Sequence, residues 1–474
     1  MKRRFITSAK NIALTTAGAM TAAMLVALPA SAETLTDALV AAYQTNPDLQ
    51  GQRALLRATD EQVAQALSGW RPTVVAQGTY SAVRNRANLS APVPGASITS
   101  NARPLTGSVT LSQNLFAGGR TVNSTEQAKF AVDAGRNTLV SVEQDTLLNA
   151  VAAYMNVIRD EGVVDLNRNN VEVLKRQLEA TRDRFQVGEL TRTDVAQSEA
   201  RLSGARTALR VAEAQLTASR AAYAKIVGHA PGTLERPKSN EGLPQSEAQA
   251  REMAAQANPD LRAARAAEAS SRAAIAVAKG ALLPSFDVQA QYQYARNPAS
   301  SSLTGTNIRS SDESAIMGVL TVPLYQSGAE YSKVRAAKEQ NSVAMMQIAS
   351  VQRAVDEAVQ NAWEQLRAAR SNMVSSREQV RANEIALEGV KQQEEVGSQT
   401  ILDVLNADQE LLNARVALVS AERDEAVAEY SLLAAMGRLT AQQLNLPVKY
   451  YDPQKNYDEV SGKWIGFGTA GDEE

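Results

Sequence analysis

Two short stretches of sequence, each with Val-Gly followed by a threonine, decide how this chain folds. The first stretch is Arg184-Phe185-Gln186-Val187-Gly188-Glu189-Leu190-Thr191-Arg192-Thr193-Asp194. The second is Glu394-Glu395-Val396-Gly397-Ser398-Gln399-Thr400-Ile401-Leu402-Asp403. Glycine readily adopts the left-handed conformation that closes a helix, and a threonine with an aspartate three residues later is typical of a helix start. Each stretch therefore predicts a tight turn between two helices, at residues 186–191 and 395–400.

The two turns belong to two copies of one architecture. Val187-Gly188 and Val396-Gly397 are separated by an offset of 209 residues, which persists over more than 100 residues. Earlier in the chain, Asn46-Pro47-Asp48-Leu49 recurs as Asn258-Pro259-Asp260-Leu261 at an offset of 212. Chance similarity between alanine-rich helices would give drifting offsets instead. The sequence thus predicts two tandem repeats, at residues 33–245 and 246–447, each a unit far longer than a solenoid repeat.

Each repeat is predicted to contain a long helical hairpin. The segment from Val122 to Phe185 has no proline, and its 64 residues would span about 96 Å as one helix. Tyr331–Glu395 is its counterpart in the second repeat, and helices of this length are typical of coiled-coil packing. Shorter helices are expected before the strands, over residues 34–70 and 246–283, each followed by a proline.

Between these helices, each repeat has two candidate strands. Phe286, Val288, Ala290, Tyr292 and Tyr294 alternate with polar residues, the period of a strand with one apolar face. The alternation predicts strands at about 73–84, 107–116, 285–295 and 315–325. The intervening segments, 85–103 and 297–311, read as long polar loops, which suit the outer side of a membrane barrel. A soluble β-sandwich is the alternative interpretation of this pattern.

The N-terminus predicts export. A basic start, an uncharged segment and Ala30-Ser31-Ala32 are typical of a cleaved signal peptide over residues 1–32. No later segment has the roughly 18 consecutive apolar residues of a transmembrane helix. If the strands enter a membrane, four strands cannot close a barrel, because bacterial barrels have at least about eight and lipid does not tolerate open sheet edges. Several chains must then share one barrel, and the pattern leaves two, three or four copies open.

Composition excludes several classes of function. The 474 residues include no cysteine and one histidine, so disulfides, thiolate metal sites and multi-histidine sites are excluded. With 49 Lys and Arg against 51 Asp and Glu, the chain has no basic excess for nucleic acid. The G-x-G-x-x-G pattern at Gly466–Gly471 has no helix after it and is no dinucleotide site. We expect no enzyme, cofactor or metal site. A periplasmic coiled-coil adaptor or scaffold remains the alternative function.

Taken together, the signal, the duplication, the paired strands and the two Val-Gly-x-x-Thr turns resemble the TolC family of outer-membrane efflux proteins. The resemblance covers roughly residues 34–447 and is most distinctive over residues 396–407. It implies a mainly α protein with membrane β-strands. It also implies a homotrimer whose 12-stranded β-barrel in outer-membrane lipid continues as a long α-helical barrel across the periplasm, closed at its tip. The implied partners are a periplasmic adaptor and an inner-membrane transporter, and the implied role is efflux of small molecules or type I protein secretion.

The same resemblance assigns roles to residues of the two turns. Asp403 stands where the family has an acidic ring at the periplasmic constriction, and three copies would raise one another's pKa and attract cations; the alternative is a helix-start carboxylate with no role in the channel. Asn406, Glu394 and Gln399 depart from the best-known member, which weakens the ring and alters the closing contacts. The implied gate residues are Asp403, Asn406, Thr193, Asp194, Glu394 and Gln399. The implied adaptor-docking residues are Val187, Gly188, Leu190, Thr191, Val396, Gly397 and Thr400. The tail, residues 448–474, is expected to be partly disordered.

Overall fold

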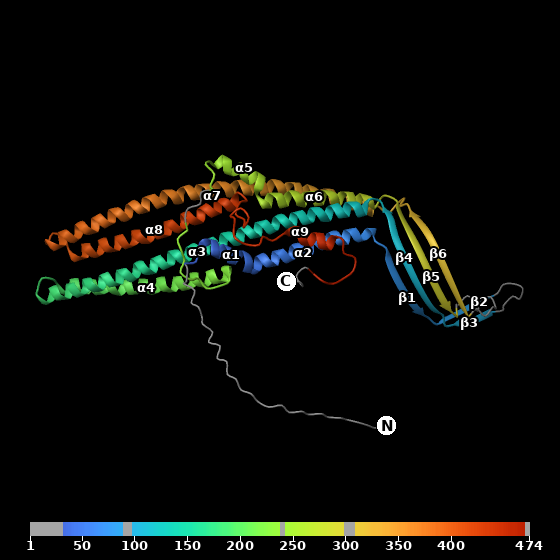
Figure 1. Ribbon diagram of the computed structural model, residues 1–474, viewed down its shortest axis with the longest axis horizontal. Helices are drawn as coiled ribbons and strands as arrows, with labels where there is room; N and C mark the ends of the chain where they lie inside the picture. The colour runs from blue at the N-terminus through green and yellow to red at the C-terminus, as the bar shows by residue number, and fades with distance from the viewer. Residues whose placement is uncertain (1–31, 89–96, 238–241, 298–308, 470–474) are drawn as a thin grey trace, which may run out of the picture.

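The molecule is elongated, with two long helical hairpins at one end and a curved sheet at the other (Figure 1). The computed structural model describes residues 32–88, 97–237, 242–297 and 309–469. The first hairpin is α3 (Arg120–Gln186) with α4 (Arg192–Val227), and the second is α7 (Ala329–Glu395) with α8 (Ile401–Ala435). The predicted tandem repeats are confirmed by this paired architecture. The predicted signal peptide, apart from its last residue, and the last five residues of the tail lie outside the described residues.

The shorter helices before the strands are each broken, which corrects the prediction of continuous helices. In place of one helix over 34–70, the structure has α1 (Leu35–Thr45), α2 (Pro47–Leu67) and a short 3₁₀ turn at Ser68–Trp70. In place of 246–283, it has α5 (Glu247–Ala257) and α6 (Pro259–Gly280). The cause is the repeated Asn-Pro, because the residue before a proline is forced out of the helical region. Asn46 is extended, and its side-chain oxygen caps α2 by accepting from the Asp48 and Leu49 amides at 3.0 and 3.3 Å.

Four strands form one antiparallel sheet in the order β1-β4-β5-β6, so the two repeats meet at the β4–β5 pair. The strands are β1 (Thr73–Tyr80), β4 (Leu105–Ala117), β5 (Ser285–Arg296) and β6 (Ser310–Thr321). Within this sheet, β1 and β6 each pair along one edge only. The last strand begins and ends earlier than the predicted 315–325, because Ser310 pairs with Arg296 and Pro323 cannot extend the ladder.

The segment predicted as a loop over residues 85–103 contains a second hairpin. Strands β2 (Val83–Asn88) and β3 (Ser97–Ala102) pair antiparallel with each other in a separate two-stranded sheet. Most residues of the two strands are polar, as in a loop, so the composition of the segment does not predict that their backbones pair. The middle of this segment, and most of the second predicted loop, lie outside the described residues.

The sheet has one apolar and one polar face, set by the register of all four strands. Val109 lies beside Ala76 and Tyr292, and Leu111 lies beside Val74 and Ala290. Along β4 the residues of this apolar face are exposed, whereas those of the other face are half-buried. The apolar face includes Val74, Ala76, Tyr80, Leu105, Val109, Leu111, Val288, Ala290, Tyr292, Tyr294, Ile316 and Leu320, and near the start of β6 it also carries Asp312 and Ser314. The polar face includes Thr106, Ser108, Thr110, Ser112, Asp287, Gln289, Gln291 and Gln293.

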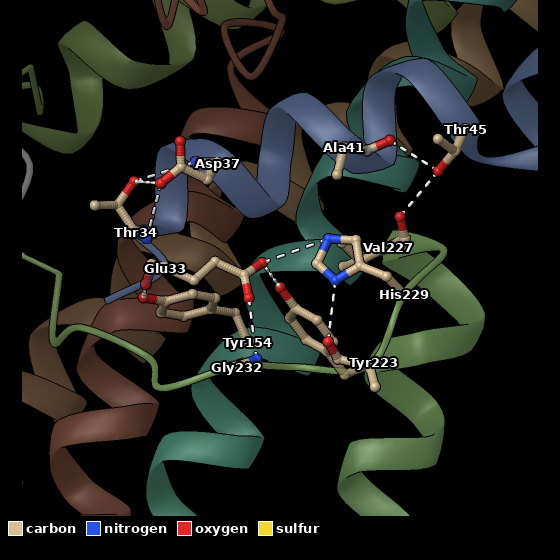
Figure 2. A network of polar contacts seen from close by, with 11 residues as sticks. Glu33, Thr34, Asp37, Ala41, Thr45, Tyr154, Tyr223, Val227, His229 and Gly232 are labelled. Carbon is tan, nitrogen blue, oxygen red and sulfur yellow. Dashed lines mark hydrogen bonds and ion pairs between the residues drawn. The ribbon is translucent and has the colours of Figure 1, made fainter. Parts of the chain in front are cut away.

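A polar network ties the start of the first repeat to the connector after it (Figure 2). The Glu33 amide donates to the Thr233 carbonyl at 2.8 Å, and the Tyr154 hydroxyl donates to the Glu33 and Glu235 carbonyls at 2.8 and 2.6 Å. Tyr223 also donates to the Glu33 carboxylate. Burial is the main cause that raises the pKa of both tyrosines, which keeps them as hydrogen-bond donors.

The tail packs on the helices over most of its described length. After the second repeat, α9 (Pro453–Ser461) lies against α2 (Figure 1). Its Asn456 amide donates to the buried Asp60 carboxylate at 2.7 Å. The sequence predicts partial disorder in this tail, and its last residues, 470–474, lie outside the described residues.

Candidate functional site

The tips of the two helical hairpins have nearly identical backbones. In each, a glycine follows the last helical residues with a left-handed φ, 83° at Gly188 and 77° at Gly397. A Cβ added at either position would meet open space, so the glycines are needed for conformation rather than for packing. The helices that follow begin at Arg192 and Ile401.

Each tip is closed by a capping box. The Thr400 amide and hydroxyl donate to Asp403 Oδ2 at 2.9 and 2.6 Å, and the Asp403 amide donates back to the Thr400 hydroxyl at 3.4 Å. Thr191 and Asp194 make the same contacts at the other tip. The Thr400 side chain, followed by its backbone amide, lowers the pKa of Asp403 below its ordinary value of 3.8. Within one chain, Asp403 thus acts as a charged helix-start carboxylate.

The two hairpins are joined near their tips by an ion pair, the clasp Arg184–Glu394. The Arg184 guanidinium donates to Glu394 Oε1 at 2.6 Å and to Glu189 Oε2 at 3.2 Å. The Glu394 side chain is 13% exposed, so this contact is partly shielded from water. The hydrogen bond that Arg184 donates to Glu394 is the largest cause that raises the pKa of Arg184. A second inter-hairpin contact lies further along the helices, where Arg201 donates to Asn406 Oδ1 at 2.6 Å.

The structure brings together some of the predicted gate residues and separates others. Glu394 and Asn406 join the two hairpins, whereas Asp194 and Asp403 each bind the threonine of their own turn. Thr193 and Gln399 are exposed. Sequence reasoning missed Arg184 and Arg201. Arg184 is 210 residues from Glu394 in the sequence. The one signal for this ion pair is that the two opposite charges stand at nearly equivalent positions of the two repeats.

The predicted docking residues form an exposed apolar end on each hairpin. Val187 is 72% exposed and Val396 is 80% exposed, which is unusual for valine in a folded protein. Leu190 is half-buried, and Thr191 and Thr400 are occupied as helix caps. The two valines and the two glycines therefore form small, solvent-exposed apolar surfaces beside the clasp.

Two absences hold for the residues that the structure describes. No group of three or more His, Asp or Glu side chains there is placed to hold a metal ion. No helix in the described part of the chain combines the length and apolar character of a membrane span.

Comparison with known proteins gives one consistent result. Residues 38–229 and 250–438 match the family described as outer membrane efflux protein, one segment in each repeat. The chain is 37% identical over 440 residues to the outer membrane efflux protein BepC of Brucella suis biovar 1, covering 93% of both chains. It is 27% identical over 428 residues to the outer membrane protein TolC of Escherichia coli (strain K12), covering 87% of this chain and 84% of TolC.

The fold matches solved channels of the same kind. The CmeC outer membrane channel of Campylobacter jejuni superposes with a TM-score of 0.75 at 18% identity, over 96% of this chain and 98% of CmeC. The match of the family across both repeats, the identity to BepC and this shared architecture agree with one another. The chain therefore belongs to the outer membrane efflux protein family, the family that sequence resemblance indicated, and it is an outer-membrane protein that extends into the periplasm.

Proposed function

We propose that three copies of this chain form an exit duct for efflux or secretion, with no enzymatic activity of its own. In the proposed trimer, the four-stranded sheets close one 12-stranded β-barrel in outer-membrane lipid, and the helical hairpins continue it as an α-helical barrel. The observation that supports this most is the two-faced sheet, whose edges at β1 and β6 are paired with no other strand among the described residues. An apolar outer face, a polar inner face and closure of every edge are what a barrel in lipid requires.

The tips are the proposed gate of this duct. Between the two hairpins of one subunit lie the Arg184–Glu394 clasp, the Arg201–Asn406 contact and the apolar packing of Leu405 on α8 against α3 and α4. Opening requires the hairpins to separate there. Asp403 of each subunit would contribute one carboxylate to an acidic ring around the axis. The capping bonds from Thr400 favour its charged form, which opposes the rise in pKa expected from three neighbouring carboxylates.

Asp403→Asn should lower the cation selectivity of single channels in planar bilayers and weaken block by multivalent cations, because the ring loses its charge. Asp408→Asn is the matched control, since Asp408 lies on the same helix but faces Lys391 at 3.9 Å. Because hydrogen bonds lower the pKa of Asp403, its charge and its capping contribution are present at neutral pH and are lost only as pH falls below about 3.8. Selectivity equal to that of the unaltered channel in Asp403→Asn would refute the acidic ring.

The exposed ends of the hairpins are the proposed docking site for a periplasmic adaptor, which would connect the duct to an inner-membrane transporter. Because the chain has no cysteine, Glu189→Cys and Ser398→Cys should each give a single crosslinking site at a tip. In intact cells, both variants should crosslink to the adaptor. Gln245→Cys, exposed in the connector just before the second repeat, is the control. Adaptor crosslinks from Gln245→Cys alone would place docking away from the tips.

A further inference from the structure

The chain exposes a small apolar turn just after its last helix. Residues 462–468, named here the C-terminal turn, carry Trp464, Ile465 and Phe467, whose exposed fractions are 66%, 92% and 103%. The Lys463 ammonium donates to the Gly468 carbonyl at 2.7 Å and closes the turn. The turn contains no acidic residue. Exposing three large apolar side chains to water is unfavourable in free energy, so we expect the turn to pack against another apolar surface.

The turn is anchored to the body of the molecule by α9. Besides the bond from Asn456 to the fully buried Asp60, Val460 is buried and the Arg136 guanidinium lies 5.2 Å from the Tyr457 ring centroid. These contacts join the tail to α2 and α3. They fix where the helix ends and hence where the turn begins.

Arg71 then holds the turn at the junction between helices and sheet. Its guanidinium donates to the Lys463 carbonyl at 2.6 Å and to the Ser461 carbonyl at 3.4 Å, and it lies 5.0 Å from the Trp464 ring centroid. Arg71 stands two residues before the start of β1 at Thr73. The C-terminal turn therefore lies level with the periplasmic end of the strands.

The same level carries an aromatic residue at each of the four strand ends. Trp70 precedes β1, Phe116 pairs with Phe286 where β4 ends and β5 begins, and Tyr325 follows β6. Trp70, Phe116 and Tyr325 are exposed, at 42%, 47% and 82%. Belts of aromatic residues at the edge of an apolar band mark the border between lipid and water.

From this placement we propose that the C-terminal turn is a lipid anchor, inserted among phospholipid headgroups of the periplasmic leaflet beside the aromatic belt. Trp464, Ile465 and Phe467 enter the acyl boundary, while Lys463 and Arg71 lie at the depth of the phosphates. The inference rests on the proposed membrane barrel and adds to it a contact made by a segment outside the strands. Phospholipid is favoured over a neighbouring subunit for two reasons. The C-terminal turn lies at the same level as the aromatic belt, and the cations Lys463 and Arg71 lie where it joins the rest of the molecule.

The native tryptophans provide the test, because Trp70, Trp363 and Trp464 are the three in the chain. Each is kept alone by changing the other two to Phe, and the trimer is reconstituted in phosphatidylcholine vesicles brominated at shallow or deep acyl positions. Trp464 should be quenched by brominated lipid to an extent comparable with Trp70, and more by shallow than by deep bromines. Trp363, on α7 in the helical part, should be unaffected and is the control.

The same measurements distinguish lipid from water or protein around the C-terminal turn. Quenching of Trp464 by aqueous iodide alone places the turn in water, and protection from both quenchers places it against protein; either result overturns the anchor. Quenching of Trp70 by lipid, in the variant that keeps Trp70 alone, shows that the barrel is inserted. If lipid quenches Trp70 but not Trp464, the anchor is wrong and the proposed membrane barrel stands. Should the double substitutions prevent folding, Ile465→Cys carrying a spin label replaces them. Lipid contact then predicts greater accessibility to oxygen than to a water-soluble nickel complex, and the reverse order overturns it.

Discussion

Glu394→Ala is expected to raise the open probability of the reconstituted channel strongly, because it removes the clasp between the two hairpins of every subunit. A partly exposed charged pair contributes about 1 kcal/mol, so three copies shift the opening equilibrium by about 3 kcal/mol, roughly 100-fold. The increase should appear as long openings and higher mean current in planar bilayers. Arg184 keeps only its bond to Glu189, which lies in its own hairpin and does not resist separation.

The chain offers a matched control for this prediction. Glu199 binds Arg182 at 2.6 Å near the same tip, but both residues belong to the first hairpin. Glu199→Ala removes the same charge and should leave the current close to that of the unaltered channel. The charge-swapped pair, Arg184→Glu with Glu394→Arg, should restore the low current. Equal currents in Glu394→Ala and Glu199→Ala would exclude the clasp as the lock.

Leu111→Arg should prevent stable insertion of the barrel. Leu111 lies on the apolar face between Val74 and Ala290 and is 39% exposed. Arginine facing lipid near the bilayer midplane costs about 2–4 kcal/mol per subunit, and the assembly carries three copies. The expected result is loss of the heat-sensitive oligomer band and a matching fall in the free energy of unfolding, measured by urea titration in vesicles.

Thr110→Arg is the control that distinguishes the polar face of the sheet from the apolar face. Thr110 is the neighbour of Leu111 on β4 but belongs to the polar face, where water can solvate the new charge. Its variant should insert and form oligomers, with altered ion selectivity as the main effect. If Thr110→Arg disrupted insertion more than Leu111→Arg did, the faces would be assigned the wrong way round.

Local chemistry explains which parts of the fold the sequence could predict. The turns at Gly188 and Gly397 depend on a left-handed glycine and a Thr–Asp box, both of which act within a few residues. The helix breaks at Asn46 and Asn258 have an equally local cause, because each Asn-Pro pair alone is enough to interrupt the helix. The alternation in β5 predicted an apolar face because its period depends only on neighbouring residues.

Contacts between distant segments account for what was missed. The Arg184–Glu394 clasp needs the two repeats to be placed side by side, and no residue pattern within one repeat determines their spacing. The β2–β3 pairing arises from backbone hydrogen bonds in a segment whose composition is typical of a loop. The position of the C-terminal turn depends on Asp60 and Arg71, almost 400 residues earlier in the chain. The roles given to all six gate residues and to the seven docking residues remain predictions.

The mass of the intact assembly tests the central claim most directly. The open edges of β1 and β6 require other copies to complete the sheet in lipid, and we propose that three do so. Native mass spectrometry of the protein released from detergent should give three times the mass of the mature chain. A single chain that stays in solution without detergent would contradict the account, and so would an assembly of two or four chains.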